Sequence, residues 1–86
     1  SNPSLYAAEQ IYEKTNNPED IITREETVEA LTKYIQDHEL EQPPGNSQYY
    51  QAIRSMGGKD FEKRINEEKL RVFRYIKPKT KKSLFH

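Results

Sequence analysis

The side chains of this chain that could ligate a metal are few and poorly placed for it. The two histidines, His38 and His86, lie far apart in the sequence. Asp37, Glu39 and Glu41 lie near His38, but residues one or two apart on a helix point in different directions. We therefore expect no metal site and no cofactor.

The arrangements that activate a nucleophile or hold a phosphate are also missing. The chain has no cysteine, and no serine lies in a Gly-x-Ser-x-Gly elbow. Gly57-Gly58 is too short to form a phosphate-binding loop. The carboxylate pairs Glu25-Glu26 and Glu67-Glu68 fall in the first turns of expected helices, where the helix dipole favours anions. We expect that the protein is not an enzyme.

Basic side chains gather in the second half of the chain. Up to Gly45 there are ten acidic and three basic residues, a net charge of 3 − 10 = −7, and from Asn46 onward there are eleven basic and four acidic residues, a net charge of 11 − 4 = +7. Lysine and arginine beside Phe73 and Tyr75 could contact phosphates while the rings stack on bases. The candidates for nucleic-acid binding are Lys69, Arg71, Arg74, Lys77, Lys79, Lys81 and Lys82. The same charges would equally serve as a solvated surface.

Aromatic and apolar side chains offer a second kind of site, a groove for a protein partner. Tyr49-Tyr50 follows a turn-forming Pro43-Pro44-Gly45 segment, and tyrosine supplies contact area with a polar tip. Such side chains also compete for places in the core. The candidates for a partner groove are Leu31, Tyr34, Ile35, Tyr49, Tyr50 and Ile53.

Helical signals dominate the chain. Pro3 favours a helix start near the N-terminus, and Thr23 with Glu26 forms a capping box before an apolar stripe, which predicts a helix over 24–39. A shorter helix is predicted over 48–56, ending at Gly57-Gly58. Asn66 is a candidate N-cap for a last helix reaching about Tyr75, although 64–65 and 71–76 leave room for a short β-hairpin.

The predicted fold is therefore mostly α. We expect a small single domain of about four helices over residues 1–76, with room for one short hairpin, followed by a basic tail over 77–86. An 86-residue chain with 33% hydrophobic residues can build only a modest core. The absence of cysteine and of a long apolar run favours an intracellular protein, nuclear or cytoplasmic, that has no contact with a membrane.

Two segments of the chain form a pattern when they are taken together. The first runs from Thr23-Arg24 through Ala30-Leu31 and Tyr34-Ile35 to Pro43, and the second is Lys63-Arg64-Ile65-Asn66-Glu67-Glu68-Lys69-Leu70 with Phe73. In this order the two segments resemble a SWIB domain. The stretch between Pro44 and Lys63 is longer than the corresponding loop of that family. A weaker similarity links Tyr50 to Arg54, Phe61 and Arg64-Ile65 with PUB domains.

Both resemblances imply protein recognition. SWIB domains grip an amphipathic helix and occur in chromatin-remodelling subunits and translation factors, whereas PUB domains bind short peptides. The resulting expectation is a protein-interaction module of a larger protein or complex, whose partner is an amphipathic helix or a short peptide. Nucleic-acid binding through the basic C-terminal segment, or PUB-like peptide binding, is the alternative, and no small-molecule ligand is expected.

Overall fold

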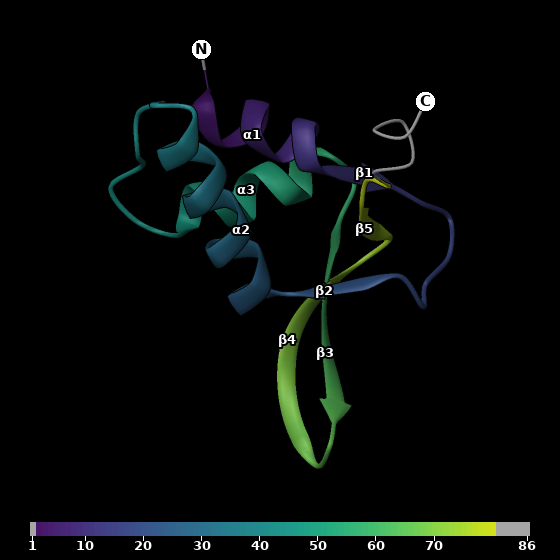
Figure 1. Cartoon of the computed structure of the whole chain (residues 1–86). Helices are drawn as coiled ribbons and strands as arrows, with labels where there is room; N and C mark the ends of the chain where they lie inside the picture. Colours follow the sequence, from purple (N-terminus) through teal and green to yellow (C-terminus); the bar gives the residue numbers. More distant parts are fainter. Residues whose placement is uncertain (1, 81–86) are drawn as a thin grey trace.

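The computed structural model describes residues 2–80, which form three helices and five short strands (Figure 1). The elements in chain order are α1 (Pro3–Ile11), β1 (Tyr12–Lys14), β2 (Ile21–Thr23), α2 (Arg24–Asp37), α3 (Ser47–Ser55), β3 (Lys59–Ile65), β4 (Glu68–Arg74) and β5 (Ile76–Pro78).

Local signals place the starts of the first two helices. Pro3 opens α1, and the Asn2 side chain accepts a hydrogen bond from the Leu5 backbone N–H at 3.2 Å. At α2, Thr23 Oγ1 accepts from the Glu26 N–H at 3.0 Å and Glu26 Oε1 accepts from the Thr23 N–H at 2.9 Å, which is the predicted capping box. The predicted helices near the N-terminus, over 24–39 and over 48–56 are confirmed, with ends that differ by one or two residues.

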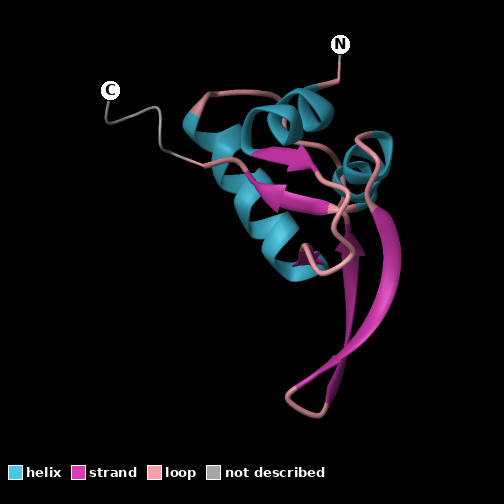
Figure 2. Ribbon diagram, turned by 90° about the vertical axis from the view of Figure 1, so that its right-hand side faces the viewer, coloured by secondary structure: helices cyan, strands magenta, loops and turns pink. Residues whose placement is uncertain are grey.

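The strands form two small antiparallel sheets. β1 pairs with β5, and β2, β4 and β3 lie side by side in that order. β2 covers only the base of β4, from Arg74 to Val72, so the outer part of the β3–β4 hairpin has no third strand. The hairpin consequently projects well beyond the helices (Figures 1 and 2).

The expectation of a mostly α fold is wrong: helix accounts for 41% and strand for 29% of the structure. The stretch predicted as a last helix from Asn66 is instead the turn and second strand of the hairpin. Asn66 and Glu67 have φ values of 51° and 67°, which are the left-handed values that a two-residue type I′ turn needs. Asn66, predicted to cap a helix, therefore belongs to a turn. The β-hairpin is longer than the short hairpin for which the sequence left room.

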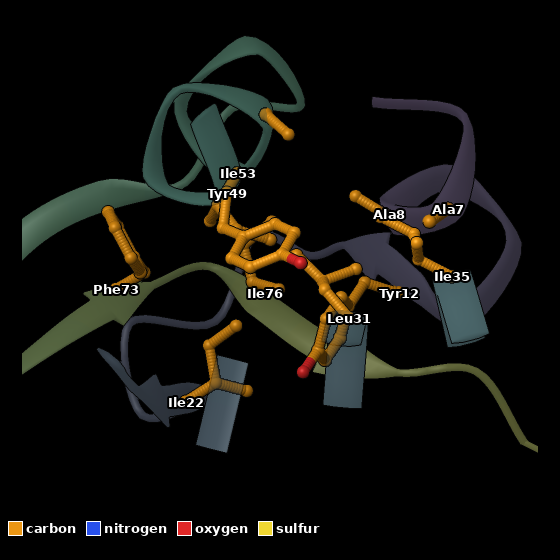
Figure 3. Close-up of a cluster of buried hydrophobic side chains, with 11 residues drawn as sticks. Ala7, Ala8, Tyr12, Ile22, Leu31, Ile35, Tyr49, Ile53, Phe73 and Ile76 are labelled. Atoms are coloured by element: carbon orange, nitrogen blue, oxygen red, sulfur yellow. The ribbon is translucent and has the colours of Figure 1, made fainter. Parts of the chain in front are cut away.

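The core lies where the helices meet the bases of the sheets (Figure 3). Leu31 and Ile35 of α2, Ile53 of α3, and Phe73 and Ile76 of the strands are all 0% exposed. Ile76 is followed by Lys77 and Pro78 in β5, and the Lys79 N–H donates to the Ile11 carbonyl at 2.9 Å. Residues 77–79, assigned to a basic tail from the sequence, are thus tied to the packed domain by strand pairing and this hydrogen bond.

Candidate functional site

Helix α3 has one packed side and one exposed polar side. Tyr49, Ala52 and Ile53 are buried against the body. The opposite side exposes Gln48, Gln51, Arg54 and Ser55. Gln48, Gln51 and Arg54 are spaced three residues apart, so a row of amide and guanidinium groups runs along the outside of the helix.

The hairpin continues this polar row. Side chains alternate between the two faces of a strand pair. Asp60 lies opposite Phe73 at the hairpin base, on the face that meets the helices, and the next pairs on that face are Glu62 with Arg71 and Arg64 with Lys69. We call the helix–hairpin surface the set of exposed amide and basic side chains on α3 and this face, beside which the carboxylates of Asp60 and Glu62 are also exposed. Its members are Gln48, Gln51, Arg54, Arg64, Lys69 and Arg71.

Two of the three basic residues on the other face of the hairpin, Arg74 and Lys63, have partners within the protein. The Arg74 guanidinium carbon lies 3.4 Å from the centre of the Phe61 ring, a close stacking contact. Lys63 Nζ is 3.8 Å from a carboxylate oxygen of Glu19, in the loop before β2. On the helix–hairpin surface, Arg54 is paired with Asp60 and Arg64 Nη1 donates to the Glu67 carbonyl at 3.2 Å, whereas Lys69 and Arg71 have no ion pair among residues 2–80.

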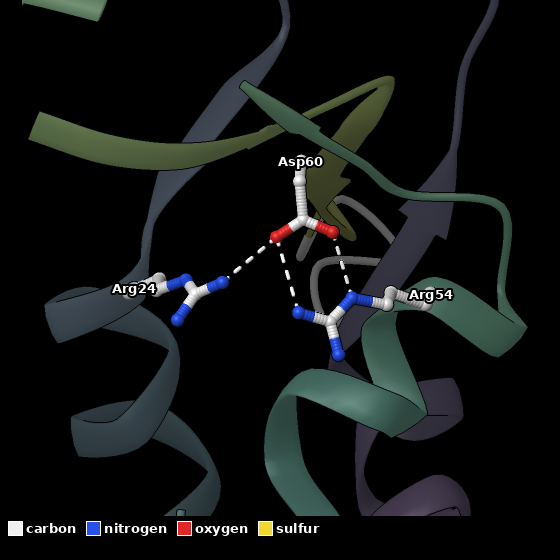
Figure 4. A network of polar contacts seen from close by, with 3 residues as sticks. All are labelled: Arg24, Arg54 and Asp60. Carbon is white, nitrogen blue, oxygen red and sulfur yellow. Dashed lines mark hydrogen bonds and ion pairs between the residues drawn. The ribbon is translucent and has the colours of Figure 1, made fainter. Parts of the chain in front are cut away.

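A carboxylate joins the hairpin to both helices (Figure 4). Asp60 Oδ2 accepts from Arg54 Nε at 2.7 Å and Oδ1 accepts from Arg54 Nη2 at 3.2 Å, while Arg24 Nη2 donates to Oδ1 at 2.8 Å. These hydrogen bonds, that from Arg54 first, lower the pKa of Asp60 from its ordinary 3.8 to about 2, against the opposing effect of burial. The pKa of Arg54 is raised by the same contact. Asp60 is therefore an anion at any physiological pH.

Arg24 is itself held by an aromatic ring. Its guanidinium carbon lies 4.4 Å from the centre of the Tyr50 ring, which belongs to α3. Tyr50 in turn lies 6.1 Å from Phe73 between ring centres. The three elements α2, α3 and β3 thus meet around Asp60 in a packed contact rather than in a loose surface ion pair.

Most of the predicted partner-groove residues lie in the core. Leu31, Ile35 and Ile53 are 0% exposed and Tyr49 is 4% exposed, so they present no surface to a partner. Tyr50 is half-buried beneath Arg24. Helical periodicity in the sequence identifies the apolar side of a helix, and in this domain that side is buried in the core.

A surface groove of about 500 Å³ does exist at a different place. It lies between the end of α1, the exposed side of α2 and the end of β5. Of the predicted groove residues only Tyr34 borders it. Its other apolar walls come from Ile11, Tyr12, Ala30 and Pro78.

The predicted nucleic-acid residues that the structure describes are divided among three regions. Lys69 and Arg71 lie on the helix–hairpin surface, whereas Arg74 lies on the other hairpin face. Lys77 and Lys79 lie at β5, where Lys79 Nζ donates to the Glu9 carbonyl at 2.6 Å. The remaining two candidates, Lys81 and Lys82, lie outside the described residues.

Sequence reasoning missed Gln48, Gln51, Arg54 and Arg64. The exposed row on α3 could have been found from its polar spacing of three opposite the apolar residues. Arg64 could not have been found in this way, because its place on the surface depends on the hairpin register.

No group of three potential metal-ligating side chains occurs between residues 2 and 80. None of the helices formed by residues 2–80 could span a lipid bilayer.

No family model, curated protein or solved structure matches this chain. The first segment of the SWIB resemblance forms α2 with its flanking residues, and the second, Lys63–Leu70, forms the tip of the hairpin. The resemblances to SWIB and PUB domains therefore remain predictions that rest on the quoted residues alone.

Proposed function

We propose that this domain binds double-stranded DNA through the helix–hairpin surface. The observation that carries the proposal is the exposed Gln/Gln/Arg row of α3, placed beside a projecting hairpin whose adjoining face carries three basic residues. The major groove of DNA is wide enough to admit an α-helix, and glutamine and arginine are side chains that pair with adenine and guanine edges there. Lysine and arginine on the hairpin suit neighbouring phosphates.

The arrangement of the elements supports this mode of binding. The helix pair α2 and α3, followed by the β3–β4 hairpin, resembles a helix-turn-helix unit extended by a hairpin wing (Figures 1 and 2). In helix-turn-helix proteins the second helix of the pair lies in the major groove. Here residues 38–46 join the two helices, a longer link than the usual turn.

The charge distribution supports the same orientation. Residues 46–80, which include α3 and the hairpin, carry nine basic and four acidic side chains. α1 and α2 lie in the part of the chain where acidic residues outnumber basic residues by ten to three. A polyanion is therefore attracted by one part of the domain and repelled by another.

The test is fluorescence anisotropy with a labelled mixed-sequence duplex of about 20 base pairs over a series of salt concentrations. Each phosphate contact contributes about −0.9 to the slope of log K against log salt. The variant R64Q/R71Q should lower the magnitude of the slope by about 1–2 and weaken binding at low salt by about tenfold or more.

The matched control is K33Q/K79Q, which loses the same charge from the groove region. Its slope should stay close to that of the wild type. Equal losses in the two double variants would place binding outside the helix–hairpin surface. A wild-type domain that binds no duplex at low salt would refute the proposal.

The groove beside α2 favours a second candidate function, peptide binding. Its walls of Ile11, Tyr12, Tyr34 and Pro78 offer apolar area, and its size suits one or two side chains of a short apolar segment. The substitution A30R would place a long cationic side chain at the groove. Peptides selected on the wild-type domain from a random library should fail to bind A30R, and retained binding would exclude the groove as their site.

A further inference from the structure

We infer that Asp60 is a positioning residue for DNA binding, which fixes the Arg54 guanidinium so that its free edge faces the nucleic acid. This inference rests on the proposed function. It assigns a role in binding to an acidic side chain, which electrostatics alone would count as unfavourable beside a polyanion.

The geometry of the contact determines which part of Arg54 remains available. A guanidinium carries five N–H donors, one on Nε and two on each Nη. Asp60 accepts from Nε at 2.7 Å and from Nη2 at 3.2 Å, so it occupies one edge of the group. Nη1 points away from the carboxylate (Figure 4).

The free edge is a planar pair of donors formed by Nη1 and the second N–H of Nη2. Two acceptors side by side, such as phosphate oxygens or the O6 and N7 atoms of guanine, match such a pair. Arg54 lies at the end of the exposed row of α3, next to the hairpin base, with 38% of its side chain exposed. Its free edge therefore lies where the helix and the hairpin would approach the same duplex.

Asp60 is itself held in place from a third element. Arg24, at the start of α2, donates to Asp60 Oδ1 at 2.8 Å and lies over the Tyr50 ring. The carboxylate consequently cannot swing with Arg54 as an isolated surface pair would. Holding a long side chain in its bound orientation removes part of the entropy cost of binding.

Removal of the Asp60 charge separates positioning from simple electrostatics, because the two effects have opposite signs. Loss of a negative charge beside DNA should strengthen binding if only charge matters. If Asp60 orients Arg54, D60N should weaken binding to the labelled mixed-sequence duplex by about fivefold, which is at the lower end of the loss expected for one arginine contact.

The matched control is E62Q, which removes the same charge from the next position on the same hairpin face. It should bind as tightly as the wild type or more tightly. R54A should lose at least as much affinity as D60N, and the double variant R54A/D60N should lose no more than R54A, because the two residues act as one unit. D60E should recover part of the affinity. Circular dichroism at the assay temperature verifies that each variant is folded.

Two negative outcomes have different meanings. If the wild-type domain binds no duplex, the proposed function fails and the inference fails with it. If the wild type binds and D60N binds as tightly as E62Q or more tightly, the proposed function stands and the positioning role of Asp60 is refuted.

Discussion

At the scale of single residues, the contact that most distinguishes this domain is the carboxylate of Asp60 between two arginines. Asp60 is 36 residues away from Arg24 in the sequence and 6 residues away from Arg54. Its side chain is 41% exposed, so solvent screens the ion pairs and their effect on stability is smaller than that of a buried pair. The contribution of these ion pairs to the free energy of unfolding can nevertheless be measured, because it depends on pH.

The pKa of Asp60, lowered to about 2 in the folded protein from its ordinary 3.8, predicts a defined pH window. A carboxylate with a depressed folded pKa stabilises the protein above its unfolded pKa, and this stabilisation is lost as the pH falls through the folded value. The wild type should therefore exceed D60N in unfolding free energy by about 1 kcal/mol at pH 5, after allowance for screening. The difference should shrink between pH 4 and pH 2.

Urea unfolding of both proteins between pH 2 and pH 6 measures this difference. The variant E62Q provides the comparison, since Glu62 lies at the next position on the same hairpin face. A difference between wild type and D60N that stays constant across the window would contradict the role of Asp60 as a stabilising anion.

At the scale of elements, the junction between α3 and β3 sets the angle at which the hairpin leaves the body. Gly57 has a φ of 108°, a backbone conformation that favours glycine. The Gly58 N–H donates to the Ile53 carbonyl at 2.9 Å, which closes the end of α3. Two residues later the chain reaches Asp60, so the junction also determines where that carboxylate lies.

Substitution of Gly58 tests how tightly this junction is packed. A Cβ atom at Gly58 would lie 2.6 Å from Ile53 Cγ2 and 3.0 Å from both Ile76 Cγ1 and the Ile53 carbonyl oxygen. Because Ile53 and Ile76 are fully buried, they have no free space into which to move. G58A should lower the unfolding free energy by about 1–3 kcal/mol.

Gly45 provides the control for this substitution. A Cβ atom added there has nothing within 4 Å, so G45A should leave the free energy of unfolding within about 0.5 kcal/mol of the wild type or raise it slightly. Thermal unfolding followed by circular dichroism compares the two variants. Equal stabilities of G58A and G45A would show that the junction is looser than the structure indicates.

At the scale of the whole molecule, the two candidate sites are made from different parts. The helix–hairpin surface belongs to α3, β3 and β4, whereas the groove is lined by residues of α1, β1, α2 and the C-terminal strand region. They share no residue. Because distant sites are usually independent, A30R should bind the duplex with nearly the wild-type affinity, and anisotropy measures this directly.

A marked loss of duplex binding in A30R would indicate that the groove and the helix–hairpin surface are coupled.

The distribution of charge is also a property of the whole molecule. A net charge of zero conceals an acidic and a basic part, and only the arrangement of α3 beside the hairpin turns the basic part into a surface that could face DNA.

Local sequence patterns were sufficient to predict the three helices, and the composition alone shows the imbalance of charge. The Thr23–Glu26 capping box, Pro3 at the first turn and the apolar spacing of α3 are local features, so a short stretch of chain is enough to specify them. The exposed row Gln48, Gln51 and Arg54 belongs to the same category, because a helix spacing alone places it on one side.

The strands, and the site built on them, depend on contacts that form only in the folded protein. Leu70, Phe73 and Ile76 have the spacing of a helix face, yet Val72 and Phe73 are both 0% exposed because β4 is covered on its two faces near its base. β4 exists because Phe73 pairs with Ile22 on one edge and with Asp60 on the other, partners that lie far away in the sequence.

Asp60 shows why the site, like the strands, could not be predicted from local sequence. Its contacts to Arg24 and Arg54 depend on the register of β3 and on the packing of α2 against α3, neither of which a local pattern encodes. Hydrogen bonds within a helix join neighbours in the chain, whereas strand pairing and side-chain networks join residues that only the folded chain brings together. The chemistry of each side chain was therefore readable from the sequence, but its partner was not.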